Sequence, residues 1–440
     1  MKGCGHAACV SSPPMPRAIA LAMALAACAV MVPCRARDLA LAETEALLAA
    51  NNRELRAAVR TVESAEAQRV IAGARPNATF SVNSSSINSN PGIGAGSLNQ
   101  KRMDTVIRVD QPFERGDKRE LRLDAASGLQ RAAQNDSLDV LRQQLGALRG
   151  TYFELKQAQE KVQVLGETAQ LFSGTLAAAQ MRLKAGDLAP ADVAKVQVDY
   201  ERAQNEARAA QGELARAQLA LAYMIGAESE AAELHVIDPW PPAEKADAAA
   251  LTKAIDERPD VLAAKARVEA AEKLRDLAKA QRSRDVTLGA QFERFPGSLP
   301  ENSVGFGIAF PLFTGYDYSG DIQKAEVDRY AALDALERMR AQAAVELRRA
   351  ANDLNAAAER LERYDTSLLG AAQRSAQAAE FAFQRGAISV LEVLDARRTL
   401  RAVRIESVTA RADHAKALAA WRSAGMNVEF LQAKIPAPQK

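Results

Sequence analysis

The chain has 440 residues, with 57 Lys and Arg against 55 Asp and Glu, and only 5% of its residues are aromatic. This balanced charge argues against nucleic acid as a partner, because nucleic-acid-binding surfaces are strongly basic. The low aromatic content and the abundance of Ala, Leu, Arg, Glu and Gln favour long helices over a sandwich or a doubly wound domain. Three His and four Cys make a clustered metal or redox site improbable.

Residues 1–36 have the pattern of a secretory signal: Lys2 and Arg17 precede an apolar run at 18–32 that is too short to span a membrane comfortably. Two processing routes are readable. Cleavage after Ala36 would remove all four cysteines, whereas the segment 25–28 resembles a lipoprotein box that would make Cys28 the acylated N-terminus. We favour cleavage after Ala36, because apolar residues continue past Cys28. Removing the segment changes the net charge from +2 to −1, and we expect an exported chain free of disulfides.

The chain contains an internal repeat with an offset of about 200 residues, far longer than the periods of about 20–50 residues seen in solenoids. Three pairs of segments resemble one another: 111–116 and 311–315, 182–193 and 383–393, and 222–226 and 421–425. We therefore predict two copies of one unit, at 37–226 and 248–427. A proline-containing linker at 227–247 joins the copies, and a tail at 428–440 follows them.

Both copies are predicted to contain a helix, a β-hairpin and a long helical hairpin, in that order. The helices are expected at 39–74 and 248–282, the β-hairpins at 77–113 and 285–313, and the helical hairpins at 114–226 and 317–425. The first arms of the helical hairpins, 114–184 and 317–385, contain no proline and would each extend roughly 100 Å. Each arm reverses at a glycine, Gly186 or Gly386, before a second helix returns.

The predicted strands alternate apolar and polar residues, so each β-hairpin should have one apolar face. Such strands cannot stand alone in a bilayer, and bacterial barrels begin at eight strands. Three copies would supply twelve strands, which predicts a homotrimer. The predicted fold is mainly α with a small β part: tandem long helical hairpins plus four strands that contribute to a trimeric 12-stranded β-barrel. On this barrel Asp104, Arg108 and Asp110 would line the lumen, although a salt-bridged pair without a transport role would place them equally well.

The two helical reversals share a further motif, in which a glycine turn precedes an acidic residue and Val, at Gly186…Asp192-Val193 and Gly386…Glu392-Val393. Together with the repeated architecture, this motif resembles the TolC-like outer-membrane efflux proteins over about 390 residues. The short segments 51–55, 75–79 and 115–119 resemble the cobalt-zinc-cadmium branch, which is the heavy-metal RND branch of that family.

The resemblance implies a trimeric duct whose barrel lies in the lipid of the bacterial outer membrane and whose helices form a periplasmic α-barrel. It implies two partners, a periplasmic adaptor (membrane fusion protein) and an inner-membrane RND-type pump, because the duct has no energy source of its own. The sequence agrees, since it contains no nucleotide-binding Gly-rich loop, catalytic-triad spacing or metal-ligand cluster. We therefore expect neither an enzyme nor a cofactor.

The resemblance also assigns roles near the reversals. Asp192, Glu392 and Asp395 would form a cation-sensitive constriction, although the helix macrodipole favours acids at such positions without any gating. The residues Gly186, Leu188, Gly386 and Ile388 would form turns that dock the adaptor, or would serve turn geometry alone. Ile388 replaces a basic residue of the family archetype, so the closing salt-bridge network is expected to be different or absent.

The leading functional hypothesis is an exit duct for small solutes, with heavy-metal cations first. Drug or organic-toxicant efflux and type I protein secretion are alternatives with the same fold. A periplasmic coiled-coil scaffold without a pore is the alternative from a different class.

Overall fold

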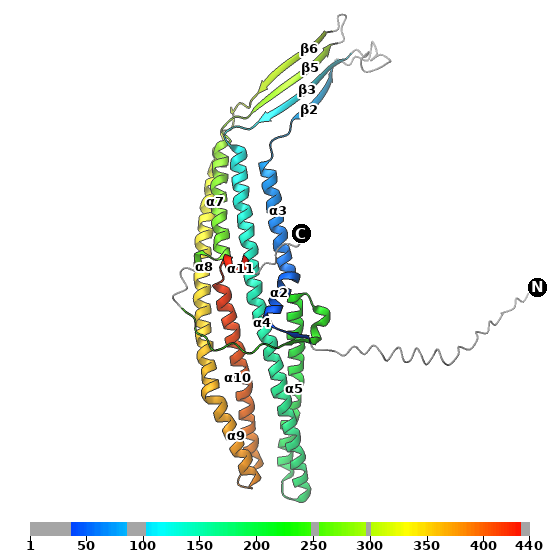
Figure 1. Cartoon of the computed structure of the whole chain (residues 1–440), viewed down its shortest axis with the longest axis vertical. Helices are drawn as coiled ribbons and strands as arrows, with labels where there is room; N and C mark the ends of the chain where they lie inside the picture. Colours follow the sequence, from blue (N-terminus) through cyan, green and yellow to red (C-terminus); the bar gives the residue numbers. More distant parts are fainter. Residues whose placement is uncertain (1–36, 86–102, 248–254, 296–300, 433–440) are drawn as a thin grey trace, which may run out of the picture.

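The computed structural model describes residues 37–85, 103–247, 255–295 and 301–432. The molecule is long and narrow, with a β-sheet at one end and two helical reversals at the other (Figure 1). Cys28 and the rest of the predicted signal segment lie outside the described residues, as do parts of the loops of both predicted β-hairpins. Long helices span the distance between the two ends.

The first half of the chain forms the helices α2 (Leu41–Asn51), α3 (Arg53–Gly73), α4 (Lys118–Ala185) and α5 (Pro190–Ile225). The stretch predicted as one helix at 39–74 is divided at Asn52. This residue has an extended backbone, and its side-chain oxygen accepts hydrogen bonds from the backbone N–H groups of Glu54 and Leu55. Asn52 is therefore the N-cap that starts α3.

The second half forms the helices α7 (Pro259–Ala280), α8 (Ser319–Arg363), α9 (Leu369–Gln384), α10 (Val390–Ala424) and α11 (Val428–Gln432). The arm predicted as one helix at 317–385 is interrupted, because a π-helical turn at Tyr364–Leu368 separates α8 from α9. Such a turn inserts an extra residue into the helical hydrogen-bond pattern and commonly changes the helix direction. The predicted tail also begins as a helix, since α11 starts at Val428.

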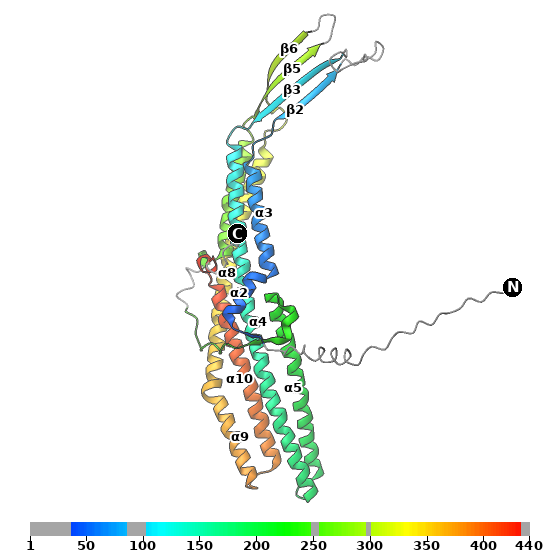
Figure 2. The same ribbon diagram turned by 45° about the vertical axis from the view of Figure 1, so that its right-hand side comes forward.

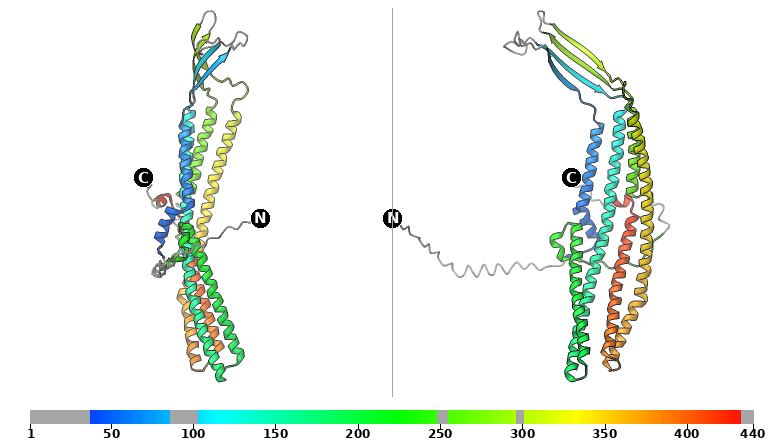
Figure 3. Two further views of the ribbon diagram at one scale, coloured as in Figure 1. Left: turned by 90° about the vertical axis from the view of Figure 1, so that its right-hand side faces the viewer. Right: turned by 180° about the vertical axis from the view of Figure 1, so that it is seen from behind.

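The long helices form a curved layer, which Figures 2 and 3 show from three further directions. Near the sheet, α3, α4, α7 and α8 lie in that order, and near the reversals the order is α5, α4, α10 and then α8 with α9. Helix α4, with 68 residues, extends for about 100 Å and belongs to both parts of the layer. The layer therefore has two lateral edges, one formed by α3 and α5 and the other by α8 and α9.

The centre of α4 carries the main apolar core. Its buried residues recur at alternating intervals of three and four, the spacing that keeps side chains on one seam of a coiled coil: Leu138, Leu141, Leu145, Leu148, Tyr152 and Leu155. Gly128, nearer the sheet, lets α4 approach α7 closely, because an added β-carbon would lie 3.0 Å from the β-carbon of Ala270. Close-packed helices explain how an Ala-rich chain buries enough surface to hold together.

The sheet consists of β2 (Thr79–Ser85), β3 (Asp104–Phe113), β5 (Val286–Phe295) and β6 (Glu301–Ala309). All neighbours are antiparallel, and the order is β2-β3-β5-β6, so β3 and β5 join the two predicted β-hairpins into one sheet. The alternating pattern in the sequence extends to residue 312, but the strand β6 ends earlier, at Ala309. None of the described helices is long and apolar enough to cross a membrane.

The predicted linker also contains structure that the sequence pattern did not indicate. After a 3₁₀ turn (Glu228–Glu233), β4 (Leu234–Val236) pairs in parallel with β1 (Arg37–Leu39). The start of the first repeat therefore packs against the linker that follows that repeat. Tyr152 fastens this pair to α4, because its hydroxyl donates to the Leu39 carbonyl (3.0 Å) and accepts from the backbone N–H of Asp238 (3.3 Å).

Candidate functional site

The two reversals have the same backbone geometry. Gly186 and Gly386 have φ values of 84° and 73°, which strain any residue with a β-carbon. At the first reversal the N–H groups of Gly186 and Asp187 donate to the carbonyls of Leu183 and Arg182, at 3.0 and 2.9 Å. The second reversal repeats both bonds at the equivalent positions. This Schellman motif ends a helix and turns the chain, so turn geometry by itself accounts for both glycines.

Leu188 and Ile388 are the half-buried apolar residues of these turns. Leu188 packs against a buried cluster that includes Phe172 of α4, Val193 of α5 and Leu394 of α10. It also lines a cavity of about 610 Å³ between the two helical hairpins, together with Val390 and Arg397. The tip of the first hairpin therefore packs on the start of α10, which sequence reasoning did not anticipate.

The acidic residues predicted to form a constriction have unequal surroundings. Asp192 lies in the first turn of α5 and pairs with Lys195 at 3.3 Å. Glu392 belongs to a capping box, since its carboxylate accepts from the backbone N–H of Ser389 (3.3 Å) and the Ser389 hydroxyl accepts from the N–H of Glu392 (3.4 Å). Asp395 is exposed and forms no ion pair with the described part of the chain. One chain does not bring these carboxylates together into a cluster.

Polar contacts join the two helical hairpins above the reversals. Asp199 of α5 accepts from Arg398 of α10 at 2.6 Å, and Glu206 of α5 accepts from Arg401 at 2.8 Å. Arg397 binds Glu380 of α9 and reaches across to Thr175 of α4. Sequence reasoning missed these contacts, although α10 shows a row of arginines at intervals of three or four residues.

The sheet presents one polar and one apolar face, as predicted. Phe80, Val109, Ala290 and Phe306 are paired across the four strands on one face, where the two phenylalanines are highly exposed. The opposite face carries Asp104, Arg108 and Asp110. Arg108 donates to Asp110 at 2.7 Å and to Gln291 of β5 at 2.9 Å. The salt-bridged pair considered for these residues is therefore present, while Asp104 lies at the start of β3.

The passage from the sheet to the helices is held by the basic segment that follows β3. The ammonium group of Lys118 is buried and binds Asp285 and the Ser283 carbonyl, each at 2.8 Å. Gly116 has a φ of 75°, and an added β-carbon would lie 2.5 Å from the Ser283 hydroxyl. This segment thus connects the first copy to the α7–β5 passage of the second copy.

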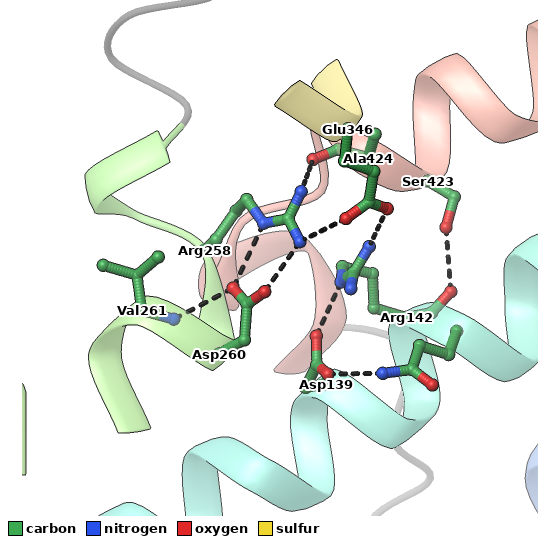
Figure 4. Close-up of polar contacts among 9 residues, drawn as sticks. Asp139, Arg142, Arg258, Asp260, Val261, Glu346, Ser423 and Ala424 are labelled. Carbon is green, nitrogen blue, oxygen red and sulfur yellow. Dashed lines mark hydrogen bonds and ion pairs between the residues drawn. The ribbon is translucent and has the colours of Figure 1, made fainter. Parts of the chain in front are cut away.

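A network of charges around the buried Arg258 connects the two copies at mid-length (Figure 4). Arg258, whose side chain is 1% exposed, donates to Asp260 (2.7 Å), to Glu346 of α8 (2.8 Å) and to the Ala424 carbonyl at the end of α10 (3.3 Å). Glu346 also accepts from Arg142 of α4 at 3.3 Å. Burial alone would raise the pKa of Asp260, but the hydrogen bonds and charge of Arg258 outweigh this effect and hold that pKa below its ordinary value.

The two histidines in the described part of the chain show no arrangement suited to a metal ion. His235 pairs with Asp38 at 3.1 Å, while His414 is fully buried and contacts the backbone of Glu244 at 3.2 Å. Within the described residues, no three His, Cys, Asp or Glu side chains are grouped as a metal site would require.

Comparison with known proteins identifies relatives of this arrangement. The cobalt-zinc-cadmium resistance protein CzcC of Cupriavidus metallidurans is 26% identical over 303 residues, which are 68% of this chain and 72% of that protein. Protein CyaE of Bordetella pertussis is 28% identical over 352 residues, or 76% of this chain and 73% of the relative.

Solved structures share the fold. A membrane protein from Pseudomonas aeruginosa has a TM-score of 0.75 at 19% identity, covering 88% of this chain and 90% of its own. CusC has a TM-score of 0.70 at 20% identity, covering 88% and 92%. The predicted fold, mainly α with long helical hairpins and a small β part, is therefore confirmed.

The pattern of the Outer membrane efflux protein family matches residues 46–227 and 250–424, one match in each half of the chain. Because these ranges include most of the sequence, this protein belongs to the outer membrane efflux protein family, with its place in the outer membrane and its helical part in the periplasm.

Proposed function

We propose that the protein is a homotrimeric exit duct of a tripartite efflux system. The observation that carries this proposal is the amphipathic four-stranded sheet with two open edges: β2 pairs only with β3, and β6 only with β5, within the described chain. A sheet in lipid must close, and bacterial barrels have at least eight strands. Three copies would give a closed barrel of twelve strands.

The edges of the helical layer support the same assembly. Helix α3 has no buried residue and exposes Val70 and Ile71, while α8 exposes Val327 and Tyr330. These apolar side chains lie on opposite edges of one layer, so adjacent copies would cover both sets. Helices and strands would then close together into one continuous tube.

Heavy-metal cations are the proposed cargo, delivered by an inner-membrane RND-type pump through a periplasmic adaptor. The name of the relative CzcC supports this choice. The carboxylates of Asp192, Glu392 and Asp395 would be repeated by the three-fold axis and would favour cations through their combined negative potential. The adaptor would dock at the turns containing Gly186, Leu188, Gly386 and Ile388, and Arg108 and Asp110 would face the lumen with Asp104.

The duct itself is proposed to be passive, without a catalytic role or a cofactor. Planar-bilayer recordings of the purified protein, combined with a measurement of its mass in detergent, test the pore and the trimer. We expect a trimer that conducts ions. A chain that stays monomeric in lipid, or that conducts at no voltage, would instead indicate the periplasmic scaffold.

Deleting the gene tests the cargo. We expect greater sensitivity to zinc, cobalt and cadmium with unchanged drug tolerance. Sensitivity to a panel of drugs alone would indicate drug or organic-toxicant efflux. Unchanged tolerance to all of these compounds with the loss of a secreted protein would indicate protein secretion and overturn the metal proposal.

A further inference from the structure

The side chain of Arg108 runs across the sheet rather than away from it. Its guanidinium binds Asp110 on its own strand and Gln291 on β5. One terminal nitrogen also lies 3.5 Å from the position that a β-carbon of Gly307 would occupy. Gly307 is on β6, two strands from β3, and adjacent strands are about 4.8 Å apart. Only a side chain that lies along the sheet surface can reach so far.

Glycines make this position available. A β-carbon at Gly289 would lie 2.6 Å from a terminal nitrogen of Arg108 and 2.4 Å from an Asp110 oxygen, which is closer than atoms can approach. A β-carbon at Gly307 would be in ordinary contact at 3.5 Å. The guanidinium thus occupies space that is free only because Gly289 has no side chain, whereas Gly307 tolerates a methyl group.

Hydrogen-bonded polar side chains form a continuous row across the polar face, starting from Arg108. Gln291 accepts from Arg108 and donates to Glu293, and the Ser303 hydroxyl on β6 donates to Glu293 at 3.3 Å. A side chain standing perpendicular to the sheet would instead carry its positive charge toward the water-filled interior. The direction of Arg108 therefore decides whether its positive charge is paired at the sheet surface or extends away from it.

We propose that Gly289 and Asp110 are specificity-determining residues of the duct: they hold Arg108 flat against the luminal wall, so that the barrel interior favours cations over anions. This inference rests on the proposed barrel. In the trimer three guanidinium groups are withdrawn from the lumen and neutralised at the wall. Releasing them would place a ring of positive charge in the path of a cationic solute, which disfavours its passage.

A local electrostatic probe tests the inference. Ser81 is paired with Arg108 in the sheet and lies on the same face. In purified full-length Ser81→Cys protein, the labelling rates of a cationic and an anionic thiosulfonate reagent are compared, after subtracting the labelling of protein without the new cysteine. Adding Gly289→Ala should lower the cationic-to-anionic rate ratio at least about twofold, because the new methyl group would overlap the guanidinium of Arg108 and displace this flexible side chain toward the lumen.

Matched variants distinguish an effect of the Arg108 position from other effects of the new methyl group and from misfolding. Gly307→Ala makes the same change on the same face and should leave the ratio unchanged. In an Arg108→Ala background, Gly289→Ala should have no effect. An unchanged ratio in Gly289→Ala, or an effect that persists without Arg108, overturns the inference. Trimer mass and bilayer conductance are measured on the same samples: a conducting trimer with an unchanged ratio overturns the inference alone, whereas a non-conducting monomer overturns the proposed function with it.

Discussion

Asp199 on α5 and Arg398 on α10 form a 2.6 Å ion pair that joins the helical hairpins of the two repeats. The carboxylate is buried, while the guanidinium is half exposed. Separating the hairpins would therefore leave a desolvated carboxylate without its partner. The pair therefore resists separation of the two helical hairpins above the reversals, which is the movement that would widen the proposed constriction.

Replacing Arg398 by Ala should weaken this connection. We expect the free energy of unfolding to fall by about 1–3 kcal/mol, because a buried acceptor loses its partner, and the single-channel conductance to rise. Chemical unfolding and bilayer recordings measure the two effects. Arg60→Ala, which removes an exposed pair with Glu63 on α3, is the matched control and should change neither. Wild-type conductance in Arg398→Ala would count against the role of this pair in closure.

Glu392 has two possible roles that its substitutions can separate. Glutamine can serve in a capping box as glutamate does, so Glu392→Gln should keep the start of α10 intact while removing the charge. Glu392→Ala should also cost about 1 kcal/mol of stability. If the charge contributes to a cation-sensitive constriction, both variants lower the cation preference in reversal-potential measurements. A change confined to Glu392→Ala would assign the residue to capping alone.

Arg258 is predicted to be far more important for stability than a surface arginine. Arg258→Ala removes the shared partner of Asp260 and Glu346, although Glu346 keeps another bond, from Arg142. Breaking a buried ion pair in this way costs about 3–5 kcal/mol. Arg340→Ala removes an exposed pair with Asp256 and should cost less than about 1 kcal/mol. Urea unfolding of both variants measures the difference, and equal losses would show that the network contributes little.

The same network predicts a dependence on pH. Because the pKa of Asp260 is lowered in the folded state, its stabilisation is fully present above the unfolded-state pKa of about 4 and is lost as the pH falls through the folded-state value. Asp260→Asn should therefore destabilise the protein more at pH 7 than at pH 3. Asp256→Asn, which breaks the exposed pair with Arg340, is the matched control and should cost less than about 1 kcal/mol at pH 7. Equal effects of Asp260→Asn at both pH values would contradict the prediction.

Replacing a glycine by alanine should lower the free energy of unfolding at the reversal and raise it within a helix. Gly386→Ala places a β-carbon at a φ of 73° and should destabilise the turn by about 1 kcal/mol. Gly174→Ala, in the interior of α4 with open space around it, should stabilise the helix by about 0.5–1 kcal/mol. Thermal unfolding of the two variants measures both shifts. A neutral Gly386→Ala would mean that the turn adopts another conformation at little cost.

Local features of the chain were predictable because local physics produces them. The sequence directly indicates features whose effect is confined to a few neighbouring residues. Examples are the alternating side chains of β5, the proline-free sequence of α4 and the glycines at the two reversals. The repeat also showed that the second half would contain the same elements as the first. The single helix expected at 39–74 was not confirmed. Asn52 divides it, because the Asn52 side chain accepts hydrogen bonds from Glu54 and Leu55 and so starts a new helix.

Contacts between distant segments required the tertiary structure. Arg258 and Glu346 are 88 residues apart, and β1 pairs with β4 across nearly 200 residues. The residues next to a charged residue in the sequence do not determine whether its side chain forms an ion pair or is exposed to water. The sequence by itself determined an exported, repeated, mostly helical chain with amphipathic strands. Only the fold decided which arginines are buried, which acids cap helices and which way Arg108 lies, because burial and pairing depend on what the rest of the chain brings alongside.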